Sequence, residues 1–473
     1  MREYFKLAWR NIWRNKRRTM ITAASIFFAV FIAIVMRSFQ LGSYDHMINN
    51  FVESYSGYIQ VQHHEYWEKR GIDYTIELKD SLLQKIKDAP NVNAVVPRLE
   101  SFALASSGEN TKGAIVMGID PEKENRMTAA NDKLVNYRIT DEALQRLQAQ
   151  TSIPENVKKK LSGLKNESYA SFDKLLLDLQ FESNAQKPYF DLIKKETQFP
   201  GEYLSDNEKS VLVADKLAKF LHLGVGDTLV LISQGYHGRS ASGLYEVKGI
   251  IDLPNPELNR SFIYMPLAQA QEFYSAFNMV TSLAINVHDN DDQDIQDTKA
   301  TIQNELNNDV YAVKDWKEMN KELVQQIQSD NASGKLILAI LYIIIAFGIF
   351  STVLMMTAER KREFGVMVAV GMQKFKLAGI VTIELIVLGF IGLFSGMLAS
   401  IPAVLIGNRN PIRLTGELAE SMESFGLEPV MPFATIDFYY VNQALVVLTL
   451  IVVAMLYPVY SITKIKVVDA LRA

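Results

Sequence analysis

Four long apolar stretches constrain this chain more than any other feature. They cover residues 19–41, 335–357, 377–406 and 441–463, and the interior of each is nearly free of charge. Each is longer than the roughly 18 to 20 residues that an α-helix needs to cross the hydrocarbon core of a bilayer. Because a soluble protein could hardly bury four such helices, we expect four transmembrane helices, the first a retained helix rather than a cleaved signal.

Lys and Arg are distributed unequally between the segments that flank these helices. The segments before the first helix, between the second and third, and after the fourth are basic, whereas the loop 407–440 holds more acids than bases. Cytoplasmic flanks are enriched in Lys and Arg. We therefore predict a multi-pass protein of the cytoplasmic (inner) membrane with both termini cytoplasmic, a tail at 464–473, and residues 42–334 outside. The chain has no cysteine, which excludes a disulfide framework.

Residues 1–18 have an apolar and a basic face at helical spacing. The apolar face contains Phe5, Trp9, Ile12 and Trp13, and the other face contains Lys6, Arg10, Arg14 and Arg17. This pattern predicts an amphipathic helix in the cytoplasmic membrane interface. A signal that sets topology by charge alone remains the alternative.

Residues 42–334 have the pattern of a mixed α and β domain. Short β-branched or alternating runs predict strands at 58–62, 114–118, 228–232, 245–251, 262–265 and 282–287. Amphipathic runs predict helices at 213–221, 267–277, 289–307 and 315–330. Residues 139–198 have little strand signal and predict a helical insertion. The expected fold is an α-helical membrane protein with four transmembrane helices and, between the first two, a large α+β extracytoplasmic domain of two lobes with this insertion.

Motifs of the common enzyme classes are missing from the sequence. The segment "ASGKL" at 332–336 lacks the upstream glycine and the hydroxyl of a nucleotide-binding P-loop. His63 and His64 are adjacent, and on a strand they would point to opposite faces. The acidic run 289–294 has Asp294 where a calcium loop needs glycine. We expect a protein that is not an enzyme, binds no metal or cofactor directly, and does not bind nucleic acid.

The segment 358–376 between the second and third apolar stretches is short and charged. One helical face of it is apolar and contains Phe364, Met367, Val368, Gly371 and Phe375. The pattern predicts a short helix across the cytoplasmic ends of two spans. It is compatible with a connector that rests on lipid and with a surface that receives force from a cytoplasmic partner.

The third apolar stretch is rich in small residues. Gly389, Gly392 and Gly396 form a face that favours close helix packing, within the chain or across a dimer. Glu384 is the acid of this stretch. An acid inside a span is a functional candidate by default, but Glu384 also lies where it could pair with a neighbouring Lys or Arg. Both interpretations remain open from the sequence.

Three motifs, in order along the chain, resemble the FtsX-like permeases, the membrane subunits of mechanotransmission ABC transporters. They are "RNIWRNKRRTMIT" (10–22), "ERKREFGVMVAVGMQKFKL" (359–377) with Glu384 downstream, and "YPVYSITKIKVVDALRA" (457–473), where Val467 replaces the usual proline. The resemblance implies that 358–376 is a coupling helix that docks on a separate cytoplasmic ABC ATPase, which binds ATP and Mg²⁺. Its candidate contact residues are Glu359, Arg360, Glu363, Phe364, Gly365, Met367, Val368, Gly371 and Phe375.

The outer region points to a branch of this family. Residues 39–61, 96–124 and 201–232 resemble permeases of the lipoprotein-releasing type, whose outer domain has a lobe of macrolide-exporter type. The resemblance implies a dimer of permeases, identical or paralogous, that extracts a lipoprotein or another amphiphile from the outer leaflet. The alternatives are export of antimicrobial peptides or macrolides, and a signalling scaffold that activates an extracytoplasmic partner such as a cell-wall hydrolase. The size of the outer domain favours transport.

Overall fold

A computed structural model describes residues 9–10, 12–13, 16–181, 187–206, 208–414, 416–424 and 428–466. The chain divides into a helical unit and an α+β unit, and each is described by itself. The helical unit comprises residues 1–46, 322–416 and 429–473, and the α+β unit comprises residues 47–321 and 417–428. Most of the predicted interfacial helix (1–8, 11 and 14–15) and of the predicted tail (467–473) lies outside the described residues.

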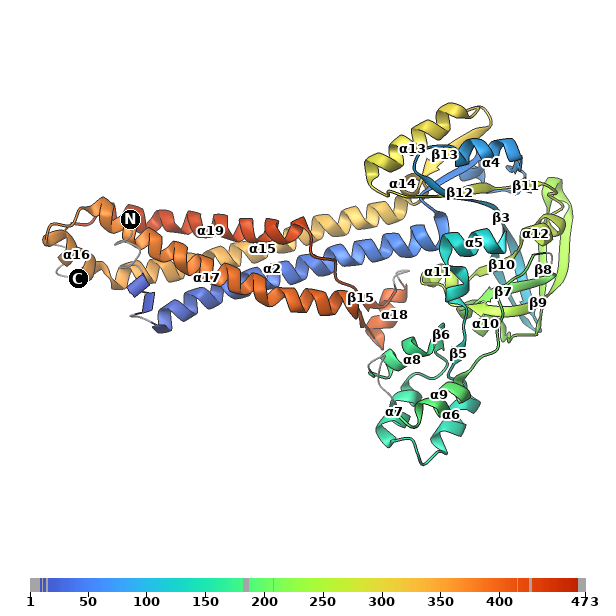
Figure 1. Ribbon diagram of the computed structural model, residues 1–473, viewed down its shortest axis with the longest axis horizontal. Helices are drawn as coiled ribbons and strands as arrows, with labels where there is room; N and C mark the ends of the chain where they lie inside the picture. Colours follow the sequence, from blue (N-terminus) through green and yellow to red (C-terminus); the bar gives the residue numbers. More distant parts are fainter. Residues whose placement is uncertain are drawn as a thin grey trace. The chain divides into compact units, whose positions relative to one another are not determined.

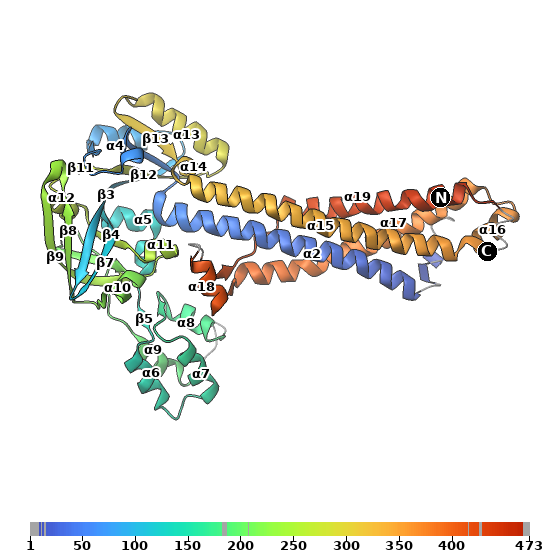
Figure 2. The ribbon, with the colours of Figure 1, turned by 180° about the vertical axis from the view of Figure 1, so that it is seen from behind.

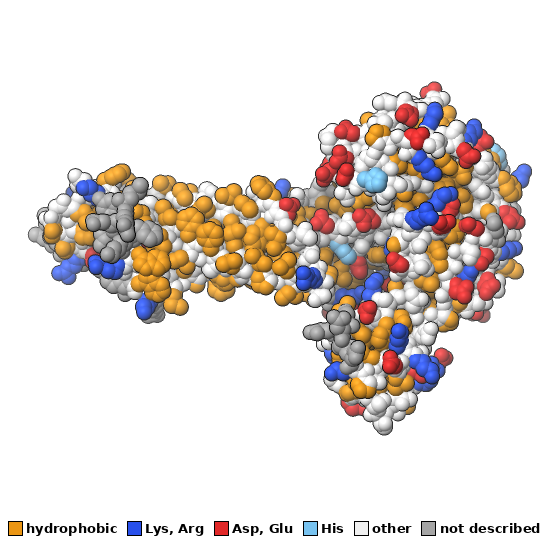
Figure 3. Space-filling model, in the orientation of Figure 1, with side chains coloured by type: hydrophobic (Ala, Val, Ile, Leu, Met, Phe, Trp, Pro, Cys, Tyr) orange, Lys and Arg blue, Asp and Glu red, His pale blue; other side chains and the backbone are white. Residues whose placement is uncertain are grey.

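Four long helices make up most of the helical unit. They are α2 (Lys16–Phe51), α15 (Lys321–Glu359), α17 (Lys374–Arg409) and α19 (Phe438–Thr463), and they run side by side in both ribbon views (Figures 1 and 2). By length and composition, all four are able to cross a membrane. Hydrophobic side chains cover much of the visible face of this unit (Figure 3), as expected of a surface in contact with lipid. The prediction of four spanning helices therefore agrees with the structure.

One apolar core holds the four helices together. Its buried side chains include Ile26 and Val30 from α2, Val353 from α15, Leu385 from α17 and Val447 from α19. α17 packs along α19 over much of its length. α2 and α15 are longer than the predicted spans 19–41 and 335–357 because each helix continues into polar sequence, which for α2 reaches the first residues of the α+β unit.

The segment that follows α17 contains three short elements. β14 (Ile412–Arg413) pairs antiparallel with β15 (Val430–Met431), and α18 (Glu417–Ser424) lies between them in the chain. After β15, the Ala434 backbone N–H donates to the Ser38 carbonyl oxygen at 2.9 Å. At Gly42, a Cβ would lie 2.5 Å from the backbone of Phe433, so the close approach of this segment to α2 requires glycine.

The α+β unit contains a nine-stranded sheet with the order β13-β1-β12-β3-β4-β10-β7-β9-β8. The strands are β1 (Ile59–His63), β3 (Val92–Ser107), β4 (Asn110–Ile119), β7 (Ser210–Ala214), β8 (Thr228–Gln234), β9 (Ser240–Ile251), β10 (Phe262–Pro266), β12 (Ser282–Val287) and β13 (Tyr311–Asp315). β3 also pairs with β8, so the last six strands of this order close into a barrel around an apolar core. The strands β13, β1 and β12 continue from β3 as an open sheet.

Helices cover the barrel and the open sheet (Figures 1 and 2). They are α3 (Tyr66–Lys69), α4 (Asp80–Lys87), α5 (Pro121–Thr128), α10 (Asp215–Leu221), α11 (Pro256–Asn259), α12 (Leu267–Phe273), α13 (Asp292–Glu305) and α14 (Trp316–Met319). A small sheet pairs β2 (Ile76–Glu77) with β11 (Met279–Val280). The single turns are η1 (Val52–Ser56), η2 (Ala130–Lys133) and η3 (Tyr236–Gly238).

The predicted insertion at 139–198 forms four helices with a core of their own, apart from residues 182–186, which lie outside the described part of the chain. The helices are α6 (Asp141–Gln148), α7 (Glu155–Gly163), α8 (Phe172–Asp178) and α9 (Phe190–Thr197). A two-stranded sheet of β5 (Tyr137–Arg138) and β6 (Ser168–Tyr169) accompanies them. The low strand signal of this region thus corresponds to mostly helical structure.

Two sequence predictions in this unit need correction. The predicted helix at 213–221 starts with the last residues of strand β7, because the buried run Val213–Ala214 belongs to the barrel wall. The predicted helix at 315–330 is the end of β13, then the short α14, and then the start of α15, with a break at Asn320. In both cases a helical apolar spacing overlaps the end of a strand.

Candidate functional site

The segment between α15 and α17 forms the short helix α16 (Lys361–Ala369). Glu359 ends α15, and Arg360 is the residue before α16. Gly371 then has a φ of 103°, a backbone conformation that residues other than glycine rarely adopt. The chain enters α17 at Lys374. A short rigid helix thus joins two candidate spans, as the sequence pattern predicts.

A buried ion pair joins the start of α16 to α17. Arg360 Nη1 donates to Glu384 Oε2 at 2.7 Å, and the two side chains are 10% and 5% exposed. Arg360 Nε also lies 3.3 Å from Glu363 Oε2, and the guanidinium lies over the Phe364 ring. Two charges removed from water are tolerated when they are paired in good geometry. Of the two interpretations left open for Glu384, the structure thus shows the paired arrangement.

The part of the apolar stripe that lies on α16 faces the helical unit itself. Phe364 is 1% exposed, Gly365 is buried, and Met367 and Val368 pack against the apolar core of the four helices. These side chains therefore present little open surface to a docking partner, since Met367 and Val368 are only partly exposed. The helical period identified an apolar face, but a period does not say whether lipid, the same chain or a partner covers that face. Their contact with the bundle fastens α16 in place.

A second apolar surface lies on the exposed side of this segment. Val366, Val370 and Phe375 are 46%, 84% and 83% exposed, and the exposed Lys361 and Arg362 precede them. Val366 lies on α16, Val370 caps its C-terminal end, and Phe375 lies in the first turn of α17. We call these three residues together the outer face of α16. Of these three, the sequence analysis named only Phe375. The i, i+4 spacing of Val366 and Val370 is the signal that could have indicated the other two.

The small-residue face of α17 makes close contacts with two neighbouring helices. A Cβ on Gly392 would lie 2.6 Å from Cβ of Ile26 and 2.8 Å from the carbonyl oxygen of Ala23. A Cβ on Gly396 would lie 2.8 Å from the carbonyl oxygen of Phe27. These contacts are within the chain, between α17 and α2. Gly389 instead faces α19, where its Cβ would lie 3.1 Å from Ile451.

A polar cluster joins α2 to α15 and was missed by the sequence analysis. The Tyr44 hydroxyl donates to Asp330 Oδ2 at 2.6 Å, and Arg37 Nη1 donates to Asn331 Oδ1 at 3.1 Å. Gln40 lies between them and donates to the Asp330 carbonyl oxygen. Arg37, Gln40 and Tyr44 recur at helical spacing on α2, which is the signal that could have revealed them. The cluster ties together the two long helices that connect along the chain to the α+β unit.

No group of three or more His, Asp or Glu that could hold a metal ion is found among the described residues. The expectation that His63 and His64 point to opposite faces needs correction, because their rings lie 4.5 Å apart. β1 ends at His63, so His64 belongs to the following turn and the alternation of a strand does not apply to it.

The fold and the site define a membrane protein with four candidate spans, the second and third joined by a short helix anchored to the bundle. Residues 335–467, which include α16, α17 and α19, match the FtsX-like permease C-terminal family. The chain therefore contains an FtsX-like permease domain, as the resemblance of its motifs implies.

A curated relative agrees with this assignment. The lipoprotein-releasing system transmembrane protein LolC of Neisseria meningitidis serogroup B (strain ATCC BAA-335 / MC58) is 22% identical over 219 residues, which is 45% of this chain. The chain spans about half the length of this relative, 50%.

The chain also matches two solved structures. One is the extracellular domain of the noncanonic ABC-type transporter YknZ from Gram-positive bacteria, with 12% identity, a TM-score of 0.28, and coverage of 55% of this chain and 100% of that one. The other is the periplasmic region of MacB from Actinobacillus actinomycetemcomitans, with 10% identity, a TM-score of 0.31, and coverage of 59% and 95%.

Proposed function

We propose that this chain is the permease subunit of an ABC transporter and that a separate cytoplasmic ATPase docks on the outer face of α16. The observation that supports this most is that the segment 366–375 exposes apolar side chains, although α16 already has an apolar face that packs on the bundle. A mere connector needs only the inner side, which fastens it to the bundle. Val370 and Phe375 are 84% and 83% exposed, and exposed apolar clusters mark interaction surfaces or lipid contacts.

Movement of the ATPase would reach α17 through the buried pair Arg360–Glu384. From α17 it would pass to α2 through the close contacts of Gly392 and Gly396. Because α2 continues as one helix into the α+β unit, work done at α16 would be delivered outside the membrane. ATP and Mg²⁺ belong to the partner in this proposal, and a second permease subunit completes a dimer.

The orientation follows from the same proposal, since an ATPase on α16 requires both chain ends in the cytoplasm and the α+β unit outside. The cysteine-free sequence makes this testable with single cysteines at Ser162 and Gln373. In intact cells, a membrane-impermeant maleimide is expected to label the first and not the second. Labelling of the cysteine at Gln373 alone would show that the chain has the opposite orientation.

For the substrate, we propose a lipoprotein or another amphiphile drawn from the outer leaflet of the cytoplasmic membrane. The similarity to a protein named for a lipoprotein-releasing system supports this class. Release of acylated protein from proteoliposomes on addition of ATP would support transport. ATP hydrolysis without any release would favour the signalling scaffold instead.

The docking proposal is tested by Val370→Asp. Val370 is exposed, so the variant should fold, but a docked ATPase would bury its charge without a partner. We expect the ATPase recovered with the detergent-solubilised permease to fall at least about tenfold, the effect of about 1.4 kcal/mol. The matched control is Val310→Asp, the same change at a surface valine of the α+β unit. Full ATPase recovery with Val370→Asp would refute docking at this face.

A further inference from the structure

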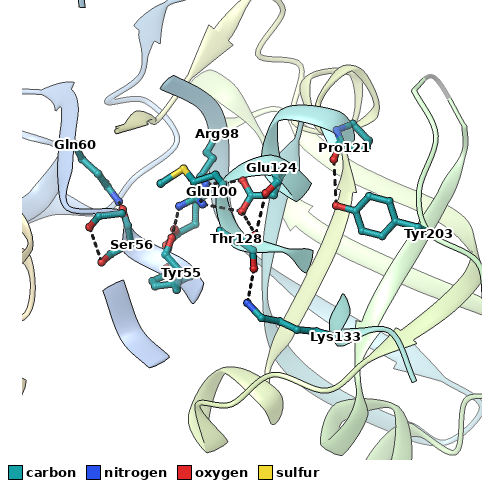
Figure 4. A network of polar contacts seen from close by, with 12 residues as sticks. Tyr55, Ser56, Gln60, Arg98, Glu100, Pro121, Glu124, Thr128, Lys133 and Tyr203 are labelled. Atoms are coloured by element: carbon teal, nitrogen blue, oxygen red, sulfur yellow. Dashed lines mark hydrogen bonds and ion pairs between the residues drawn. The ribbon is translucent and has the colours of Figure 1, made fainter. Parts of the chain in front are cut away.

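A fully buried ion pair lies inside the α+β unit (Figure 4). Arg98 on β3 and Glu124 on α5 are 1% and 0% exposed. Arg98 Nε donates to Glu124 Oε2 at 2.9 Å, and Arg98 Nη2 donates to Glu124 Oε1 at 2.7 Å. The Thr128 hydroxyl donates to the same Oε1 at 3.1 Å. The carboxylate of Glu124 therefore accepts hydrogen bonds from both Arg98 and Thr128. The bidentate contact with Arg98 fixes the orientation of the two side chains as well as their distance.

The remaining nitrogen of the guanidinium reaches the turn that follows α2. Arg98 Nη1 donates to the carbonyl oxygen of Tyr55, which lies in η1 (Figure 4). η1 is a π-helical turn, a rare conformation that is common at functional sites. The Tyr55 hydroxyl donates to Glu100 Oε2 on β3 at 2.8 Å. The turn is thus bound to β3 through both its backbone and its side chain.

Close packing supports the same turn from the side of α5. Gly57 ends η1 with a φ of 71°, in the region that favours glycine. A Cβ at this position would lie 2.6 Å from Cε of Met127 on α5. The turn therefore has little room to shift relative to α5 without a change of the Arg98–Glu124 geometry.

Arg98 also marks the point at which β3 passes from one part of the unit to the other. It pairs with Ser282 on β12, which belongs to the open sheet, and with Ile119 on β4, which belongs to the barrel. Arg98, a residue of the strand shared by sheet and barrel, thus contacts both the turn that follows α2 and the helix α5. Any rotation of the open sheet against the barrel must bend β3 near this residue.

Stability alone does not explain this arrangement. A buried Arg–Glu pair loses the hydration of both charges, and its replacement by apolar residues of similar size is often neutral or stabilising. What apolar residues cannot supply is the fixed direction of the bidentate contact and the bond to the Tyr55 carbonyl. The geometry is therefore better suited to position the turn than to hold the domain together.

We infer that the Arg98–Glu124 pair is a positioning device that fastens the turn after α2 to β3, so that movement of α2 changes the angle between the open sheet and the barrel. The inference rests on the proposed function, because it takes the ATPase as the source of the movement. It goes beyond that function by naming the residues at which the movement enters the outer domain.

The test uses the complete permease with its ATPase in nanodiscs. The sequence has no cysteine, so cysteines can be introduced in place of Thr228 in the barrel and Ala300 on α13. Spin labels on these two cysteines report the distance between the barrel and α13. The distance distribution is measured without nucleotide and with ATP plus vanadate. It is measured in the parent chain, in Arg98→Met with Glu124→Leu, and in Arg98→Lys, which keeps the charge but loses the planar fork.

We expect the nucleotide to shift the distance in the parent chain. The apolar double variant should lose this shift while its ATP hydrolysis persists, and Arg98→Lys should lose at least half of the shift. If the double variant does not fold, Arg98→Lys decides the question. A parent-like shift in the folded variants overturns the inference and leaves the proposed function standing. A distance that does not respond to nucleotide in the parent chain refutes the proposed movement itself and the inference with it.

Discussion

The contact between α17 and α2 makes a quantitative prediction for Gly392→Ala. The added Cβ would lie 2.6 Å from Cβ of Ile26, whereas carbon atoms in contact are normally about 3.5–4.0 Å apart. The carbonyl oxygen of Ala23 lies 2.8 Å from the same position, and a backbone atom cannot rotate away. The two helices must therefore separate by about 1 Å, which for carbon pairs forfeits a quarter to a half of the dispersion attraction or more.

The expected cost is that of overpacking, about 1–3 kcal/mol. Alanine also gains about 1 kcal/mol over glycine in helix propensity, which would mask part of this cost. Gly379→Ala on the same helix removes this ambiguity, because no atom lies within 4 Å of the Cβ position there. The difference between the two variants isolates the packing cost, and we expect Gly392→Ala to be about 1–3 kcal/mol less stable than Gly379→Ala.

The assay is unfolding by sodium dodecyl sulfate in mixed micelles, followed by circular dichroism, with each variant measured against the parent. In the complete transporter, Gly392→Ala should also lower substrate release more than ATP hydrolysis. If Gly392→Ala and Gly379→Ala agree within about 0.5 kcal/mol, the close contact of α17 with α2 does not exist as described here.

Two further predictions concern charged residues. Glu384→Gln removes the buried counter-charge of Arg360 and leaves it only the half-exposed Glu363, so we expect the same assay to show a loss of about 3 kcal/mol, most of it recovered when Arg360→Met is added; equal stability of both variants would contradict this. Burial and the charge of Asp215 raise the pKa of Asp252 to about 6, so the folded state retains this proton between about pH 4 and 6, and the free energy of unfolding falls as pH rises through this window. Between pH 4 and 7, the free energy of unfolding of Asp252→Asn should fall by about 1–3 kcal/mol less than that of the parent. The thermal midpoint of the variant should accordingly change less over this pH range.

The spanning helices were predictable from the sequence because one physical requirement, apolar length, determines them. The strands were less so, and β3 shows why. At its barrel end the inward positions hold the small residues Ser101, Ala103 and Ala105, while the larger Phe102 and Leu104 are exposed. A narrow barrel leaves little room inside, so the usual alternation of large inward and polar outward residues is reversed. A search for that alternation therefore misses this strand.

The candidate site was predictable in position but not in contacts. The charged, striped segment located α16, but the side of the helix that remains open depends on how the four long helices pack around Phe364. The pairing of Glu384 was one of two open interpretations, because the sequence does not show that Arg360 reaches it. Arg98 and Glu124 gave no signal at all. They lie 26 residues apart, each near other charged residues, and only the fold brings them together.

The two buried Arg–Glu pairs lie at comparable places in the chain. Arg360 precedes α16, where the chain turns between two spans, and Arg98 contacts the turn that follows α2. If movement passes from α16 to the outer domain through both pairs in turn, the loss of either pair is enough to interrupt it. Their contributions to the free energy of unfolding, in contrast, are independent. Replacing both pairs with apolar residues should then add the two stability changes, as distant sites do. The loss of ATP-dependent movement, by contrast, should be no greater than with either pair replaced alone. Losses that multiply would instead mean that two separate routes connect α16 to the outer domain.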